Sequence, residues 1–254
     1  MVACSQCNTP MLATDRFCAQ CGASKSKVKD KKDKRSIGLI IAFYGSMLLF
    51  LLISTFVYAQ VENMFVTELT IEIIFIVLTV GFSIVDLKNI LPLYSVKSID
   101  TKALAIAVVF PLFTAFTVWY LIGELNWVLF NENPSMMEDY AYYNRPFLWA
   151  FIYISLVAPI FEELAFRGFL FNQVRAVASV RITIIATAFI FALIHLSLFS
   201  LLWIFPFGLA LGYLRHKYRT LWLGMIVHFI HNTAVLVLDY NLYYDRWPLI
   251  HYFQ

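Results

Sequence analysis

Several long apolar stretches of this sequence contain ionisable or amide side chains. They are Glu162, Glu163, Arg167, His195, His228 and Asn232. An ionisable side chain inside a membrane-spanning helix is costly, so each one marks a candidate functional position. A carboxylate held among apolar groups can act as a base near neutral pH, and a histidine can share its proton. A second histidine and an amide can donate hydrogen bonds to an oxyanion. Together these residue types suit hydrolysis by an activated water molecule.

Helical spacing divides these residues into groups with different tasks. Glu163 and Arg167 are four residues apart, so we expect them to pair. His228 and Asn232 are also four apart and share one helix face. Glu162 lies about 100° around the helix from Glu163, so it remains free for chemistry. The spacing therefore favours Glu162 as the base and Glu163 with Arg167 as supporting residues.

The depth of these residues in the membrane gives an independent argument. Counting about 1.5 Å per residue from the nearest basic loop residue places Glu162, His195, His228 and Asn232 in one layer, about 14–21 Å deep. Side chains that serve only to pack three helices would have no reason to share a depth. Hydrogen bonding between helices is the alternative role, and we expect it for His231. No serine or cysteine nucleophile motif is present, which disfavours covalent catalysis.

The elements that position these residues follow from the composition. Apolar residues make up 61% of the 254 positions and charged residues 14%, against roughly 45–50% and about 25% in soluble domains. We therefore expect an all-α membrane protein, a polytopic bundle of about seven (seven or eight) transmembrane helices. The predicted spans are 36–61, 67–85, 103–123, 146–174, 182–196, 198–214 and 220–238. The fifth and sixth would form a helical hairpin that breaks at residues 195–197, because residues 182–214 are too long for one crossing.

The distribution of basic residues predicts the orientation of this bundle. With a cytoplasmic N-terminus, 17 of the 19 Lys and Arg residues fall on the cytoplasmic side, and only Arg145 and Arg246 lie outside. Residues 24–36 form a basic cytoplasmic segment, which we expect to be a solvated linker. The transmembrane domain then occupies residues 37–254, and the polar motifs lie within 147–237.

All four cysteines lie in the first 23 residues, as Cys4–x–x–Cys7 and Cys18–x–x–Cys21. Two such pairs supply four thiolates to a tetrahedral Zn²⁺, so we expect a structural zinc ribbon in residues 1–23. Disulfides are the alternative, but the predicted orientation places these cysteines in the reducing cytosol. Because four protein ligands leave no open coordination position, the zinc would be structural.

The polar motifs resemble the signatures of the CAAX protease and bacteriocin-processing (Abi) family of membrane peptidases, which includes the type II CAAX prenyl endopeptidases. The family's EExxxR, FxxxH and HxxxN motifs match Glu162 to Arg167, Phe191 to His195, and His228 to Asn232, in order. The resemblance covers about residues 147–237 and implies an intramembrane endopeptidase. It implies that Glu162 and His195 activate water, that His228 and Asn232 form the oxyanion site, and that Glu163 and Arg167 support the cleft.

Two alternatives remain open at the level of the sequence. The first is a zinc-dependent protease in which Glu162, His195 and His228 bind the metal, although no HExxH motif is present. The second is a non-enzymatic immunity or scaffold protein of the membrane. The expected partners are the lipid bilayer, a peptide or membrane-protein substrate and a cytoplasmic partner of the zinc ribbon, with no nucleic acid. The layout suggests a multi-pass protein of a bacterial cell membrane.

Overall fold

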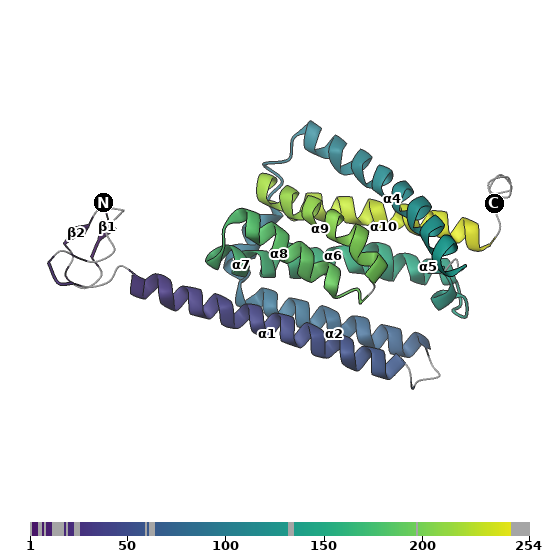
Figure 1. Ribbon diagram of the computed structural model, residues 1–254, viewed down its shortest axis with the longest axis horizontal. Coiled ribbons are helices and arrows are strands. Elements are labelled where there is room, and N and C mark those ends of the chain that lie inside the picture. Colours follow the sequence, from purple (N-terminus) through teal and green to yellow (C-terminus); the bar gives the residue numbers. More distant parts are fainter. Residues whose placement is uncertain are drawn as a thin grey trace.

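The computed structural model describes residues 2–244, apart from residues 5–6, 8, 12–17, 19, 23–25, 59, 61–63, 132–134 and 197. Its described part contains seven long helices, which correspond to the seven predicted spans (Figure 1). They are α1 (Ser26–Tyr58), α2 (Met64–Val85), α4 (Thr101–Phe130), the continuous segment α5 to α7 (Pro146–Val177), α8 (Val180–Leu193), α9 (Leu198–Tyr218) and α10 (Trp222–Tyr243). The expected all-α membrane bundle is confirmed.

Five of these helices are long and apolar enough to cross a membrane, namely α1, α2, α4, the α5–α7 segment and α10. Helix α8 has 14 residues, which makes it about 21 Å long and shorter than the hydrocarbon core of about 30 Å. It ends at Leu193, Leu196 adopts a positive φ of 50°, and α9 begins at Leu198. The chain therefore leaves the helix at residues 194–196, within the stretch where the break was predicted, and residue 197 lies outside the described residues; α8 and α9 form the helical hairpin.

The basic segment before the first span belongs to the same helix as the span itself. Helix α1 begins at Ser26 and continues without interruption into the apolar stretch. Lys and Arg are good helix formers, and adding residues to an existing helix is easier than starting a new one. The basic segment can therefore extend the membrane helix without packing against another element. The N-terminal module lies beyond this end of α1 and contains two short antiparallel strands, β1 (Val2–Ala3) and β2 (Pro10–Met11) (Figure 1).

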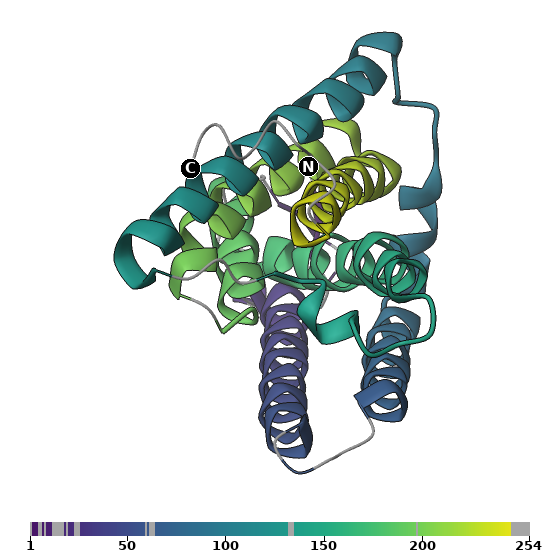
Figure 2. The same ribbon diagram turned by 90° about the vertical axis from the view of Figure 1, so that its right-hand side faces the viewer.

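The arrangement of the helices encloses the α5–α7 segment. Helices α1 and α2 run side by side along one edge of the bundle, and α4 crosses over α10 on the opposite side (Figures 1 and 2). Three short helices complete the connections, α3 (Leu87–Ile90), η1 (Leu91–Tyr94) and η2 (Glu138–Tyr140). The helix that carries the EExxxR motif thus lies in the interior, between the α1–α2 pair and α10.

An aromatic core fixes this central helix against its neighbours. Phe43 of α1 and Phe82 of α2 meet edge to face, with ring centroids 5.2 Å apart. Phe166 of the central helix contacts Phe43 and also Phe191 of α8, at 5.8 and 5.2 Å. Such ring pairs add to the stabilisation from apolar burial. The core therefore positions the central helix on both sides.

The central helix is not a regular α-helix. It contains two π-helical segments, η3 (Phe151–Val157) and η4 (Glu163–Leu170), on either side of α6 (Ala158–Glu162). The remaining parts are α5 (Pro146–Ala150) and α7 (Phe171–Val177). Pro159 lacks a backbone donor, which loosens the hydrogen-bond ladder of the preceding turn. π-Helical segments are frequent at functional sites, and here Glu162 and Glu163 stand at the start of the second one.

Candidate functional site

The Glu163–Arg167 pair is buried in the middle of the bundle. Nη1 of Arg167 donates to Oε1 of Glu163 at 2.8 Å, and the two side chains are 1% and 0% exposed. Nη2 of Arg167 lies 3.4 Å from the carbonyl oxygen of Gly208 in α9. The guanidinium lies 4.2 Å from the ring centroid of Phe191 in α8. A buried charge pair is tolerated only when additional contacts satisfy its hydrogen-bonding groups. Through these contacts Arg167 joins the central helix to α8 and α9.

His228 of α10 lies between the two adjacent glutamates. Its Nε2 is 3.8 Å from Oε2 of Glu162, and its Nδ1 is 3.4 Å from Oε1 of Glu163. Glu163 is sealed from the surroundings, whereas 16% of the Glu162 side chain is accessible. The two carboxylates therefore have different surroundings. Glu163 pairs with Arg167, whereas Glu162 is partly accessible and lies beside an imidazole.

Several polar atoms of this cluster lack a hydrogen-bond partner among the described residues. They are Oε2 of Glu162, Oε2 of Glu163 and Nδ1 of His228. Buried polar atoms in folded proteins are almost always hydrogen-bonded to protein or to water. The cluster therefore has spare hydrogen-bonding capacity, which a water molecule or a substrate group can use.

Gly224 permits the close approach of α10 to these carboxylates. A Cβ atom at this position would overlap with Oε2 of Glu163. On the neighbouring helix α9, a Cβ at Gly208 would come within 3.1 Å of Cβ of Ala188, so Gly208 allows α9 to pack closely against α8. Gly224 is a further residue of the site that the motifs do not include, although a glycine one turn before His228 is a signal for a close approach of the backbone.

His195 and Asn232 occupy less direct positions than expected. His195 follows the end of α8, its side chain is exposed, and its Nδ1 is 2.9 Å from the carbonyl oxygen of Phe191. Among the described residues, no hydrogen bond or ion pair joins it to Glu162. Nδ2 of Asn232 donates to the carbonyl oxygen of Ile154 at 2.8 Å, in the first π-helical segment. The Phe191 ring links the two histidines, since its centroid is 5.1 Å from that of His195 and 6.0 Å from that of His228.

His231 and Glu72 are further polar groups near this layer. His231 is buried against the rings of Trp203 and Phe207, and its Nδ1 lies 2.9 Å from Oγ1 of Thr114. These contacts fit the structural role expected for it. Glu72 of α2 lies close enough to Glu162 for their charges to interact. A third carboxylate thus stands near the accessible one.

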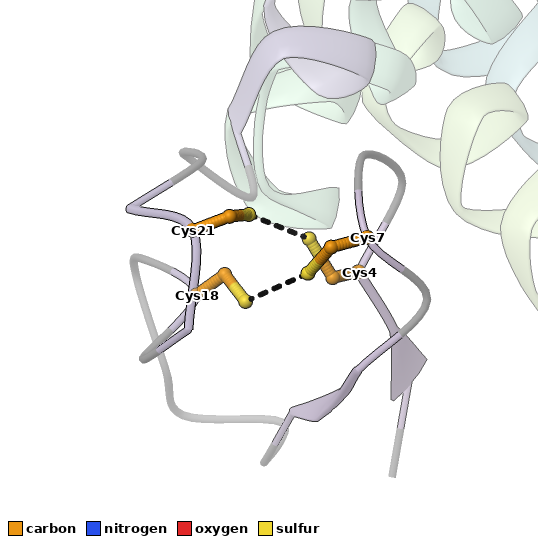
Figure 3. A group of neighbouring side chains, drawn as sticks. All are labelled: Cys4, Cys7, Cys18 and Cys21. Atoms are coloured by element: carbon orange, nitrogen blue, oxygen red, sulfur yellow. Dashed lines mark hydrogen bonds between the residues drawn. The ribbon is translucent and has the colours of Figure 1, made fainter.

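The four cysteines come together in the N-terminal module (Figure 3). Their sulfur atoms all lie within 4.8 Å of one another, and no disulfide joins them. The Cys4–Cys21 and Cys7–Cys18 sulfur distances are 3.6 and 3.5 Å. The edge of a regular tetrahedron with zinc–sulfur bonds of about 2.3 Å is about 3.8 Å. This group can therefore hold a metal ion, and its geometry fits tetrahedral thiolate coordination.

The surroundings of Cys7 favour the form that binds metal. Hydrogen bonds to the side chain and backbone of Thr9 lower the pKa of the Cys7 thiol to about 6. The thiolate is the form of cysteine that binds metal, so Cys7 can coordinate a metal ion near neutral pH.

Glu162, His195 and His228 do not form a comparable group. In the described part of the chain, the four cysteines are the one set of three or more His, Cys, Asp or Glu residues whose ligand atoms gather closely enough for one metal ion. The contacts of Glu162 and His228 are instead those of a carboxylate–imidazole pair. The arrangement as it stands suits proton transfer to and from a water molecule.

Part of the chain is similar to a known protein family. Residues 144–234 match the family model described as type II CAAX prenyl endopeptidase Rce1-like. UPF0177 protein YaiH of Lactococcus lactis subsp. lactis is 28% identical over 155 residues, which cover 58% of this chain and 60% of that protein. The chain thus spans about three fifths of the curated relative that it matches. No solved structure matches it. The family match includes all the clustered residues from Glu162 to Asn232.

Proposed function

We propose that this chain, whose residues 144–234 match the family model of Rce1-like type II CAAX prenyl endopeptidases, hydrolyses peptide bonds within the membrane. The observation that carries the proposal is the contact between His228 and the partly accessible Glu162, beside a fully buried Glu163–Arg167 pair. The buried pair fixes the helix, and the accessible carboxylate is left for chemistry.

Glu162 acts as the general base in the proposed reaction. It takes a proton from a water molecule, and the oxygen of that water attacks the carbonyl carbon of the substrate. The tetrahedral intermediate collapses when the carbon–nitrogen bond breaks and the proton passes to the leaving amine. One water molecule is consumed, and one carboxyl group and one amino group are produced. No covalent enzyme intermediate is needed.

His228 and Asn232 stabilise the negative charge that develops on the substrate oxygen. Nε2 of His228 lies 3.8 Å from the Glu162 carboxylate. The Asn232 amide has a second N–H besides the one that donates to Ile154. Oriented donors in a water-poor site are among the strongest contributions to catalysis. We assign His195 to the positioning of the water, from the other side of the Phe191 ring.

The substrate class that we propose is a membrane-associated peptide or protein in a bacterial cell membrane, with the N-terminus of the enzyme in the cytoplasm. The distribution of basic residues supports this orientation, and the similarity to a Lactococcus protein supports the bacterial source. We further propose that the metal of the four-cysteine module is Zn²⁺ and that the module binds a cytoplasmic partner.

Comparison of membrane proteomes tests the activity and identifies substrates at once. Cells with the wild-type chain, Glu162→Gln and Glu124→Gln are compared, because Glu124 is an exposed carboxylate on α4. We expect uncleaved precursors, and loss of the matching new N-termini, in the Glu162→Gln cells alone. If Glu162→Gln protein inserts normally and every precursor is still processed, the proposed function is wrong.

A further inference from the structure

Two cavities open at the end of the bundle that lies nearest the N-terminal module (the left-hand end in Figure 1). Their volumes are about 530 and about 320 Å³. They adjoin each other, because Asn172 and Arg175 of α7 line both. The smaller cavity lies between α7, the C-terminal end of α9 and the short helix η1. Neither cavity contains any of the residues that we place in the hydrolytic site.

The walls of the smaller cavity carry positive charge without negative charge. Its lining consists of Leu93, Phe171, Asn172, Arg175, Arg215, His216 and Arg219. It therefore presents three guanidinium groups and an imidazole but no carboxylate. In the larger cavity, by contrast, Asp86 accepts hydrogen bonds from Asn89 and Asn172.

Arg215 is the central residue of this cavity, and it is only 8% exposed. Its Nε donates to the carbonyl oxygen of Arg167 at 2.9 Å, and its Nη2 donates to Oδ1 of Asn172 at 3.0 Å. Both acceptors are neutral, and no described carboxylate lies within ion-pair distance of Arg215. A buried charge without a counter-charge is costly. The cavity is therefore an incomplete site that an anion would complete.

The position of the cavity indicates which anion. It lies where membrane-spanning helices end, which is the level of lipid headgroups, and Leu93 and Phe171 give it apolar walls. The planar guanidinium binds phosphate oxygens through two parallel hydrogen bonds. We propose that the cavity formed by Arg175, Arg215 and Arg219 binds the phosphate group of an anionic phospholipid from the adjoining leaflet.

The bound phosphate would influence the hydrolytic site through Arg215. The same guanidinium that faces the cavity holds the backbone carbonyl of Arg167, and the Arg167 side chain holds Glu163. Glu163 in turn contacts His228. The lipid would thus stabilise the π-helical segment that carries the paired residues. The lipid site is independent of the proposed hydrolysis, because its test measures binding and not cleavage.

The test uses the purified full-length chain in detergent and follows thermal unfolding by the fluorescence of its six tryptophans. The probes are short-chain phosphatidylglycerol, short-chain phosphatidylcholine and inorganic phosphate. The variant is Arg175→Gln/Arg219→Gln, since both side chains are exposed and their replacement leaves the core intact. The matched control is Lys97→Gln/Lys102→Gln, which removes the same charge from exposed positions outside the cavity.

We expect phosphatidylglycerol to raise the melting temperature of the wild type and of the lysine control to the same extent. The arginine variant should need at least about tenfold more of this lipid for the same shift, because each lost guanidinium removes charge-assisted hydrogen bonds. Equal shifts in the arginine variant and the wild type would overturn the proposal. Equal stabilisation by phosphatidylcholine, or by inorganic phosphate at the same concentration, would overturn the assignment to an anionic lipid.

Discussion

The four-cysteine module and the Glu162–His228 site hold their polar side chains in different ways. In the described part of the module, the buried apolar cluster consists of Cys4 and Cys18 alone, and the strands are two residues long. At the Glu162–His228 site, by contrast, an aromatic core surrounds the polar residues and fixes their helices. We therefore expect the module to depend on a bound metal ion for its order, whereas packing of the helices holds the residues of the membrane site in place. Changes at the two sites should have separable effects.

Replacement of His228 should give a large loss of activity. His228→Ala removes the imidazole that contacts Glu162, and we expect hydrolysis to fall by about 10²–10⁴-fold. The measurement is the rate of cleavage in proteoliposomes. Val237→Ala is the control, because Val237 is exposed on the same helix and lines neither cavity. Comparable rates for the two variants would contradict the role assigned to His228.

Replacement of Arg167 should give the largest loss of stability. Arg167→Met leaves Glu163 buried without its partner, and such a change costs about 3–5 kcal/mol. Thermal or denaturant unfolding of the purified protein measures this cost. Lys102→Met is the control, since Lys102 is exposed on α4. A variant as stable as the control would show that the Glu163–Arg167 pair is not needed to hold the helix.

A smaller effect is expected from Gly224→Ala. The added methyl group would overlap with the Glu163 carboxylate, and overpacking of this kind costs about 1–3 kcal/mol. Gly123→Ala on α4 is the matched control, because no atom lies within 4 Å of a Cβ at that position. The melting temperature should fall for Gly224→Ala alone. An unchanged melting temperature would mean that α10 can move away from Glu163 without cost.

Changes in the four-cysteine module should have the smallest effect on the bundle. Replacement of all four cysteines by serine should abolish metal binding and leave the melting temperature of the membrane domain unchanged. Elemental analysis of the full-length chain should find one zinc ion per wild-type chain and none in this variant. A zinc ion that remains tightly bound in the variant would point to Glu162, His195 and His228 as ligands and would contradict hydrolysis without a catalytic metal.

The sequence predicted those parts of the fold and site that depend on local spacing. The apolar spans, the break in the helix near His195 and the pairing of Glu163 with Arg167 all follow from helical geometry and residue type. Other features depend on contacts between distant helices, and spacing could not reveal them. These include the contact of His228 with both glutamates and the hydrogen bond from Asn232 to Ile154. The spacing of the motifs also did not indicate the π-helical segments of the central helix.

The helical form of the basic segment has a similar explanation. Composition indicated only that residues 24–36 are charged and solvated, whereas the helical backbone from Ser26 onward depends on the apolar helix that follows. The position of His195 shows a further limit. The FxxxH motif places it one turn from Phe191, but only the end of α8 determines that its side chain is exposed there.

The proposed reaction requires the Glu162 carboxylate to activate the water that cleaves the substrate. Its most direct test is the rate of cleavage, in proteoliposomes, of a precursor identified by the proteome comparison, measured together with the melting temperature of each protein. We predict that Glu162→Gln lowers this rate by at least about 10³-fold while its melting temperature, and both values for Glu124→Gln, stay near those of the wild type. Cleavage by Glu162→Gln at the wild-type rate would contradict the account.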